Sequence, residues 1–96
     1  MDVKKIKKHH LHDYEIGKII IDYNEGIIQI QLFDPKGAED ELIIDGFTNI
    51  DIVRKEEWGK SKYIAASDME EVGSFINAYI QLCSGDEINV RVGRKS

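Results

Sequence analysis

Cysteine, proline and long apolar runs are scarce in this sequence, and the scarcity excludes several classes of protein. The single cysteine, Cys83, cannot form an intrachain disulfide and is typical of a reducing compartment. No apolar run approaches the roughly 20 residues that a membrane-spanning helix needs. No apolar stretch follows the basic first residues, so we expect no secretory signal and predict a cytoplasmic protein.

Charge is unevenly spread along the chain, whose net value is −5. Residues 1–12 hold four lysines and one aspartate, whereas the remaining residues hold nine basic and 17 acidic side chains. We expect residues 1–12 to be a flexible basic tail and residues 13–96 to fold as one β-rich domain. An acidic domain lacks the basic footprint of nucleic-acid-binding proteins, and no segment suits a membrane. The expected partner is another protein, and a basic one fits the charge.

Alternating apolar residues predict a β-hairpin in the first third of the chain. Isoleucine and leucine alternate with glutamine over residues 27–33, and residues 14–23 form a second isoleucine-rich strand. A slip of one residue would turn an apolar face toward glutamine, so burial restricts the register. A four-residue loop at residues 24–27 fits without forcing Glu25 to positive φ. The expected pairs are Tyr23 with Ile28, Ile21 with Ile30 and Ile19 with Leu32.

Turn signals divide the middle of the chain into further short strands. Asp34, Pro35 and Gly37 occupy the first, second and fourth positions of a type I turn. Strands are expected at residues 42–44, 47–53 and 63–65, separated by a charged loop at residues 55–62. Gly46 interrupts the pattern and predicts a bulge or bend.

The stretch from residue 67 to residue 83 has two interpretations. Ser67 and Glu70 form a capping-box pattern ahead of apolar residues at helical spacing, which favours a helix. A hairpin loop at residues 84–86 would instead pair this stretch with the C-terminal strand, and Gly73 weakens a helix interior. The expected hairpin pairs are Leu82 with Ile88, Ile80 with Val90 and Ala78 with Val92.

We therefore predict an all-β fold, an antiparallel meander of about six or seven strands that forms a sandwich or partial barrel. It includes one short helical turn at residues 68–72. The alternative is an α+β fold with a helix at residues 68–83. The predicted core contains Ile19, Ile21, Ile28, Ile30, Leu32, Ile50, Ile52, Ile64, Ile80, Leu82, Ile88 and Val90.

The charged loop around Trp58 is the main candidate binding site. Tryptophan supplies a large apolar contact and an N–H donor, so Trp58 suits a binding anchor, and Tyr63 has the same properties. Glu56 and Glu57 would steer a basic partner. The competing interpretation is that Trp58 folds under the loop as a plug that closes one end of the core.

The histidines are the only grouping that resembles a metal site. His9, His10 and His12 lie beside Asp13, and in an extended segment His10 and His12 share one face. A rigid metal site needs further ligands, so we expect no metal and no other cofactor. Neither a nucleophile elbow nor a phosphate-binding glycine loop is present, so we predict no enzymatic activity.

Three segments resemble a loose set of small β-rich bacterial proteins of largely unknown function. They are LHDYEI at residues 11–16, WGKSKYI at residues 58–64 and SGDEI at residues 84–88. Some proteins of this set lie beside bacterial toxins as immunity proteins. The resemblance implies a non-catalytic protein-interaction module. One form of such a module is an immunity protein that neutralises a toxin. The alternative function is a small metal-dependent enzyme or factor that uses the histidines.

Overall fold

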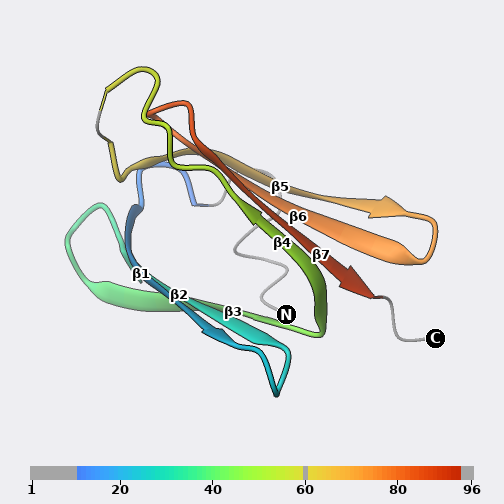
Figure 1. The fold of residues 1–96 in the computed structure, drawn as a ribbon. Helices are drawn as coiled ribbons and strands as arrows, with labels where there is room; N and C mark the ends of the chain where they lie inside the picture. The colour runs from blue at the N-terminus through green and yellow to red at the C-terminus, as the bar shows by residue number, and fades with distance from the viewer. Residues whose placement is uncertain (1–10, 60, 94–96) are drawn as a thin grey trace.

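The computed structural model describes residues 11–59 and 61–93, which form seven antiparallel β-strands and no helix (Figure 1). None of these residues belongs to a helix that could cross a membrane. The all-β prediction is confirmed, and the sheets form an open sandwich rather than a closed barrel. The strands are β1 (Glu15–Asp22), β2 (Ile27–Phe33), β3 (Glu39–Asp45), β4 (Phe47–Ile52), β5 (Ile64–Val72), β6 (Phe75–Leu82) and β7 (Glu87–Gly93).

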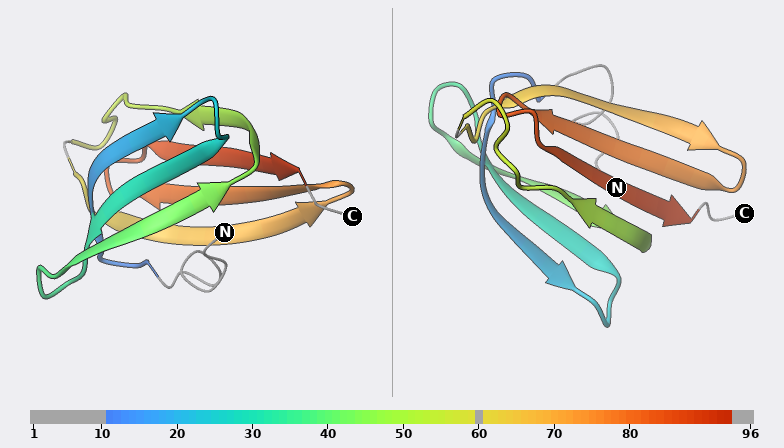
Figure 2. Two further views of the ribbon diagram at one scale, coloured as in Figure 1. Left: turned by 90° about the horizontal axis from the view of Figure 1, so that it is seen from below. Right: turned by 45° about the horizontal axis from the view of Figure 1, so that its top comes forward.

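The strands divide into two sheets that differ in connectivity. One sheet has the order β1-β2-β3, and the other has the order β4-β7-β6-β5. Figure 2 shows that the sheets face each other, with β1 and β4 along one side and β3 and β5 along the other. Each of these four strands pairs with a single neighbouring strand in its sheet, so the sandwich has four strand edges.

Strand alternation places the core between the two sheets. Along β2, Ile28, Ile30 and Leu32 are buried, while the residues between them are partly exposed. The described residues contribute twelve buried apolar side chains to this core. They are Leu11, Ile28, Ile30, Leu32, Leu42, Ile44, Ile64, Ala78, Ile80, Ile88, Val90 and Val92.

Two backbone junctions tie the sheets together. At one, Gly46 adopts a φ of 75° between β3 and β4, and its N–H donates to the Gly26 carbonyl at 2.8 Å. The predicted bend at Gly46 is confirmed. At the other, the N–H of Ile16 donates to the Lys62 carbonyl at 2.8 Å, and the N–H of Ile64 donates to the Tyr14 carbonyl at 2.8 Å. The start of β1 is thereby joined to the start of β5.

The predicted tail of residues 1–12 lies almost wholly outside the described residues, so the predicted domain boundary stays a prediction. Leu11 is described, and its side chain is 1% exposed in the core. Its carbonyl accepts the N–H of Tyr14 at 3.0 Å. Leu11, which lies two residues before the predicted boundary, is therefore part of the core.

The predicted helical turn at residues 68–72 is wrong, and so is the alternative helix at residues 68–83. Strand β5 continues to Val72, which pairs with Phe75 of β6. Gly73 permits the tight reversal between them by adopting a φ of 60°. Pairing along the whole of β6 outweighs the local capping pattern of Ser67 and Glu70, because each residue gains a cross-strand neighbour.

Two edge positions of the predicted core are wrong. Ile21 of β1 and Ile52 of β4 are 47% and 42% exposed. Both have buried cross-strand neighbours and therefore point inward. They remain exposed because β1 and β4 are edge strands, with no further strand beyond them among the residues that the structure describes. The prediction also missed five buried residues, namely Leu11, Leu42, Ile44, Ala78 and Val92.

Candidate functional site

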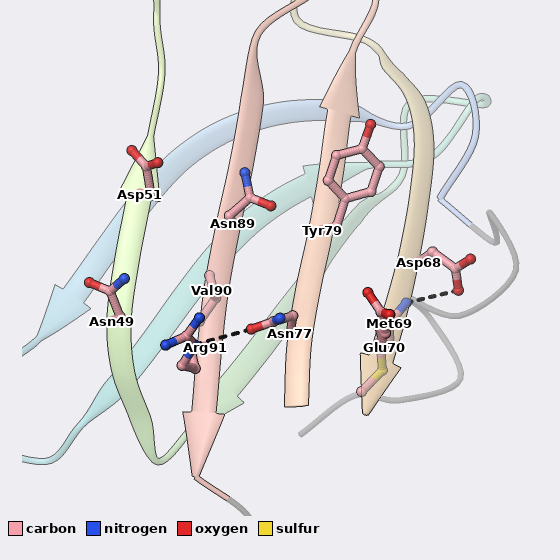
Figure 3. A pocket seen from close by; sticks show the side chains of 10 residues that line it. All are labelled: Asn49, Asp51, Asp68, Met69, Glu70, Asn77, Tyr79, Asn89, Val90 and Arg91. Carbon is pink, nitrogen blue, oxygen red and sulfur yellow. Dashed lines mark hydrogen bonds between the residues drawn. The ribbon is translucent and has the colours of Figure 1, made fainter. Parts of the chain in front are cut away.

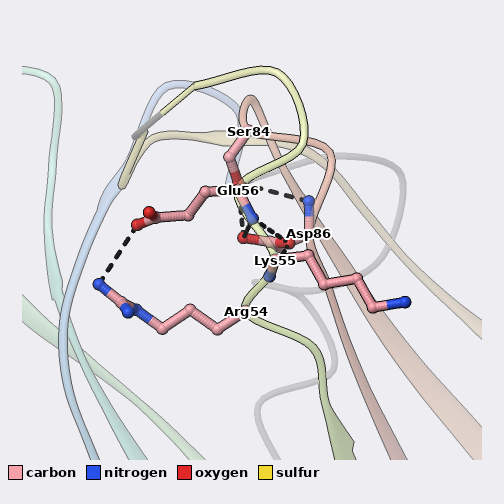
Figure 4. Close-up of polar contacts among 5 residues, drawn as sticks. All are labelled: Arg54, Lys55, Glu56, Ser84 and Asp86. Carbon is pink, nitrogen blue, oxygen red and sulfur yellow. Dashed lines mark hydrogen bonds and ion pairs between the residues drawn. The ribbon is translucent and has the colours of Figure 1, made fainter.

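The loop between β4 and β5 is held against the β6–β7 turn by one buried carboxylate (Figure 4). Asp86 is 3% exposed, and its Oδ1 accepts the backbone N–H of Lys55 at 2.7 Å and of Glu56 at 2.9 Å. Its Oδ2 accepts the Glu56 N–H at 2.9 Å and the Ser84 hydroxyl at 3.1 Å. Asp86 thus connects two segments that lie about thirty residues apart in the sequence.

These contacts determine the ionisation of Asp86. Burial alone would raise the pKa of its carboxyl group, because a charge is costly where water is excluded. The backbone donors of Glu56 and Lys55, the Ser84 hydroxyl and the charge of Arg54 outweigh burial and lower the pKa below its ordinary value. Asp86 is therefore a structural carboxylate whose charge is already matched by the protein.

Trp58 lies on the turn that Asp86 secures. Its backbone N–H donates to the Ser84 carbonyl at 3.0 Å, and its ring lies directly over Gly85. A Cβ atom at Gly85 would come within 2.7 Å of the indole, so only glycine allows this close approach. The side chain of Trp58 is nevertheless 70% exposed. The plug interpretation is therefore wrong, because one face of the ring packs on the turn and the rest faces solvent.

Replacing Gly85 by alanine is expected to displace the Trp58 ring and destabilise the protein. Gly85 has a φ of 91°, a conformation that costs a non-glycine residue roughly 1–2 kcal/mol, and the new methyl group would also clash with the indole. The measurements are urea denaturation and the emission maximum of Trp58. If the packing is as described, Gly85→Ala destabilises the protein less in a Trp58→Ala background. Equal destabilisation in both backgrounds would contradict the stacking.

The other predicted binding residues lie around this loop in different settings. Glu56 is half-buried, and its carboxylate pairs with Arg54 at 3.2 Å. Glu57 is exposed next to Trp58. Tyr63 is half-exposed, and its carbonyl accepts the Cys83 N–H at 2.9 Å, so Tyr63 and Trp58 both border the β6–β7 turn. Of the two predicted steering acids, Glu57 is the exposed one.

A cleft of about 590 Å³ lies below the loop, between the beginning of β1 and the end of β4. Its apolar walls come from six residues, and Arg54, Glu56, Lys62 and Tyr63 stand among its polar lining. The Lys62 ammonium pairs with Glu15 at 3.0 Å, and this contact raises the pKa of Lys62. The apolar lining consists of Ile16, Ile19, Ile52, Val53, Leu82 and Ile88.

The outer face of the four-stranded sheet holds a polar hollow of about 540 Å³ (Figure 3). Strand pairing arranges its side chains in two rows across four strands. Three carboxylates and one guanidinium give this hollow a net negative charge, which suits a cationic group on a partner. The rows are Asp51, Asn89, Tyr79 and Asp68, then Asn49, Arg91, Asn77 and Glu70.

Two side chains of the hollow are held in place by neighbours. Arg91 lies over the Phe75 ring at 5.1 Å, and its Nε donates to Asn77 Oδ1 at 3.4 Å. Burial first, and the charge of Glu87 second, raise the pKa of the Tyr79 phenol, so Tyr79 is neutral near pH 7. The hollow therefore presents both hydrogen-bond donors and acceptors.

The predicted histidine cluster is described only in part. His9 and His10 lie outside the described residues, whereas His12 Nδ1 lies 3.3 Å from an Asp13 oxygen at the surface. No group of three or more metal-ligating side chains occurs among residues 11–59 and 61–93. The metal-dependent alternative stays a prediction.

Sequence reasoning found Trp58 but missed Asp86, which fixes its position. The available signal was the Ser84-Gly85-Asp86 tripeptide, a turn sequence in which serine and aspartate often hydrogen-bond to the backbone. That signal identifies the turn but not the distant loop it binds. A scan against protein-family models and searches of curated proteins and solved structures found no match to this chain.

Proposed function

We propose that this protein is a non-catalytic protein-interaction module whose binding anchor is Trp58. The observation that supports the proposal most directly is that the large aromatic side chain of Trp58 is 70% exposed, although its loop is held in place by hydrogen bonds. Gly85 supports one face of the ring, and the bonds of Asp86 to the loop limit its movement. A pre-ordered aromatic loses little entropy on binding, and tryptophan is enriched among residues that dominate binding energy.

The proposed partner is a basic protein. The net charge of −5 favours encounter with a positively charged surface, and Glu57 stands beside the anchor to guide it. The finer proposal is a bacterial cytoplasmic protein that neutralises a toxin, which rests on the resemblance of residues 11–16, 58–64 and 84–88 to proteins of that kind. The lone Cys83 is consistent with a reducing compartment.

Trp58→Ala is expected to weaken partner binding without unfolding the protein. Because most of the side chain faces solvent, the free energy of unfolding should change by less than about 1 kcal/mol. Loss of an anchor of at least 2 kcal/mol should speed dissociation by about 30-fold. The immobilised chain would capture partners from a lysate of its own cell, and dissociation rates would be measured with the purified partner.

Tyr23→Ala is the matched control, because Tyr23 is an exposed aromatic on the β1–β2 turn. Its partner retention should equal that of the wild type. Equal retention by a correctly folded Trp58→Ala variant would contradict the anchor. For the finer proposal, the captured protein should arrest growth when expressed alone, and co-expression of the chain should restore growth.

A further inference from the structure

The apolar cleft below the β4–β5 loop has the size and the lining of a small-molecule site. Its volume of about 590 Å³ lies within the range of roughly 300–1,000 Å³ that ligand sites occupy. Both sheets contribute to its walls, with Ile16 and Ile19 from β1 and Ile52 from β4. Ile52 is 42% exposed, so an apolar occupant would remove from water a surface that the protein itself leaves open.

A β-bulge in β1 directs two isoleucines toward this cleft. Ile16 pairs with Leu32 of β2, and three positions later Ile19 pairs with Ile30. Residues three positions apart in a regular strand point to opposite faces, but the extra residue of a bulge places both on the inner face. Gly17, inside the bulge, also lines the cleft. Bulges are frequent beside functional sites, where they change the direction of side chains.

The borders of the cleft are fixed by hydrogen bonds to the backbone. The start of β1 is joined to the start of β5, and Asp86 holds the β4–β5 loop through the N–H groups of Lys55 and Glu56. The cleft is therefore formed before a ligand arrives, and binding need not order the loop.

The charged groups that line the cleft already have partners within the protein. Arg54 pairs with Glu56 at 3.2 Å, and the Lys62 ammonium pairs with Glu15 at 3.0 Å. The carboxylate of Asp86 accepts the N–H groups of the loop. A charged ligand would have to displace one of these partners or leave its own charge unpaired beside the apolar walls. The lining therefore favours an uncharged occupant.

We propose that this cleft binds a small uncharged molecule with an apolar body and a single hydroxyl or carbonyl group. The body would contact the isoleucine walls, and the polar group would lie near Ser61 and Tyr63, which line the cleft and carry hydroxyl groups. A side-chain hydroxyl both donates and accepts, so it can pair with either kind of head group. This site goes beyond the proposed function, because it requires neither Trp58 nor a protein partner.

The test compares 1-octanol, octanoate and octylamine, which have the same chain length and differ in the charge of the head group near pH 7. Binding to the full chain is measured by displacement of N-phenyl-1-naphthylamine, an uncharged dye that fluoresces in apolar sites. 1-Octanol should bind with a dissociation constant on the order of 0.1 mM and at least tenfold more tightly than either ion. 1-Hexanol, which lacks two methylene groups, should bind at least fivefold more weakly than 1-octanol. Absence of 1-octanol binding below about 1 mM, or equal or tighter binding of either ion, would overturn the proposal.

The methyl resonances of isoleucine locate the ligand on the wild-type chain by nuclear magnetic resonance. 1-Octanol should shift the signals of Ile16, Ile19 and Ile52, which line the cleft. The matched controls are Ile20 and Ile43, which oppose Gln29 on the outer face of the other sheet and are 54% and 37% exposed. Shifts of equal size at the controls would show nonspecific adsorption to exposed isoleucine and would overturn the site.

Two isoleucine-to-glutamate variants test the same assignment. Ile52→Glu places a charge in the cleft and should weaken 1-octanol binding at least tenfold, whereas Ile43→Glu should bind as the wild type does. Unchanged binding by a folded Ile52→Glu variant would contradict the site. Circular dichroism checks each fold, and the head-group series decides the question on the wild-type chain if a variant unfolds.

The outcomes separate this site from the proposed function. Binding of 1-octanol should survive Trp58→Ala, whereas capture of the basic partner should not. If 1-octanol fails to bind while Trp58-dependent capture persists, the small-molecule site alone is overturned.

Discussion

Replacing Ile30 by alanine is expected to lower the free energy of unfolding by about 2–5 kcal/mol. Ile30 is fully buried in β2, the central strand of its sheet, between Ile19 of β1 and Leu42 of β3. The substitution removes three carbons and leaves a cavity that neighbours on both sides can fill only in part. Since small domains are stable by only about 5–15 kcal/mol, this loss should be evident in urea denaturation followed by circular dichroism.

Ile21→Ala is the matched control for this prediction. Ile21 has the same chemistry, lies on the same side of the same sheet and pairs with buried Ile28, but it is 47% exposed on an edge strand. Its loss should cost about 1 kcal/mol or less, because the side chain already contacts water. Equal losses at the two positions would contradict the difference in burial between the centre and the edge of the sheet.

Asp86→Asn is expected to release the β4–β5 loop and lower the melting temperature by on the order of 10 °C. An amide supplies one acceptor oxygen in place of two, and its NH₂ group would face the backbone donors of Lys55 or Glu56. Ser84→Ala removes one donor to the carboxylate and the acceptor of the Asp86 N–H at 3.3 Å. It keeps both backbone donors of the loop paired with Asp86, so it should have a smaller effect. Differential scanning calorimetry measures the melting temperatures, and hydrogen exchange measures opening of the loop.

The same variant should change how stability depends on pH. Folding lowers the pKa of Asp86, so the stabilisation is fully present above its ordinary value near 3.8 and is lost as the pH falls through the lower folded value. Wild-type stability should therefore fall from about pH 4 downward more steeply than that of Asp86→Asn, which has no proton to bind at this position. If the free energy of unfolding fell equally with pH in the two proteins, protonation of Asp86 would not contribute to the loss of stability in acid.

The two hairpins show how far alternation determines strand pairing. In both, sequence assigned the isoleucines, leucines and valines to the correct face, but the register was wrong, and Tyr23, expected to pair with Ile28, lies exposed in the turn. Ile21 pairs with Ile28 rather than Ile30, and Ile80 pairs with Ile88 rather than Val90. The predicted registers differ from these by two residues, and a shift of two preserves the faces. Burial of apolar side chains therefore cannot distinguish the predicted registers from the observed ones.

The conformation and hydrogen bonds of the turn residues determine which of the two registers forms. The first loop comprises residues 23–26, with Gly26 at a φ of 68° and the Glu25 N–H bonded to Asp22 Oδ1 at 3.1 Å. In the second turn, the Leu82 N–H donates to the Asp86 carbonyl at 2.9 Å, which extends pairing to Leu82 and brings the Asp86 side chain under the β4–β5 loop. A glycine at the last position of the loop, where φ is positive, is a sequence signal for the observed register of the β1–β2 hairpin.

The candidate site was less predictable than the fold. Composition identified the loop around Trp58 as a binding surface, but the support for Trp58 comes from Gly85, which lies 27 positions later in the sequence. Such contacts depend on how β4 and β7 pair. The alternation of apolar and polar residues within one segment does not indicate which distant strand pairs with it. The exposure of Ile21 and Ile52 has the same origin, because strand order decides which strands become edges.

The partner of β4 is β7, the last of the strands among the described residues, and this pairing constrains folding on the ribosome. The three-stranded sheet can form as it emerges, because β1, β2 and β3 pair in chain order. Strand β4 must then wait until β7 leaves the exit tunnel, since β7 alone joins it to β6. Throughout that interval the nascent chain exposes the apolar faces of β2 and β3. A premature stop before Glu87 would leave β4 without a partner, so the shortened product would lack its four-stranded sheet and become a substrate for chaperones and proteases.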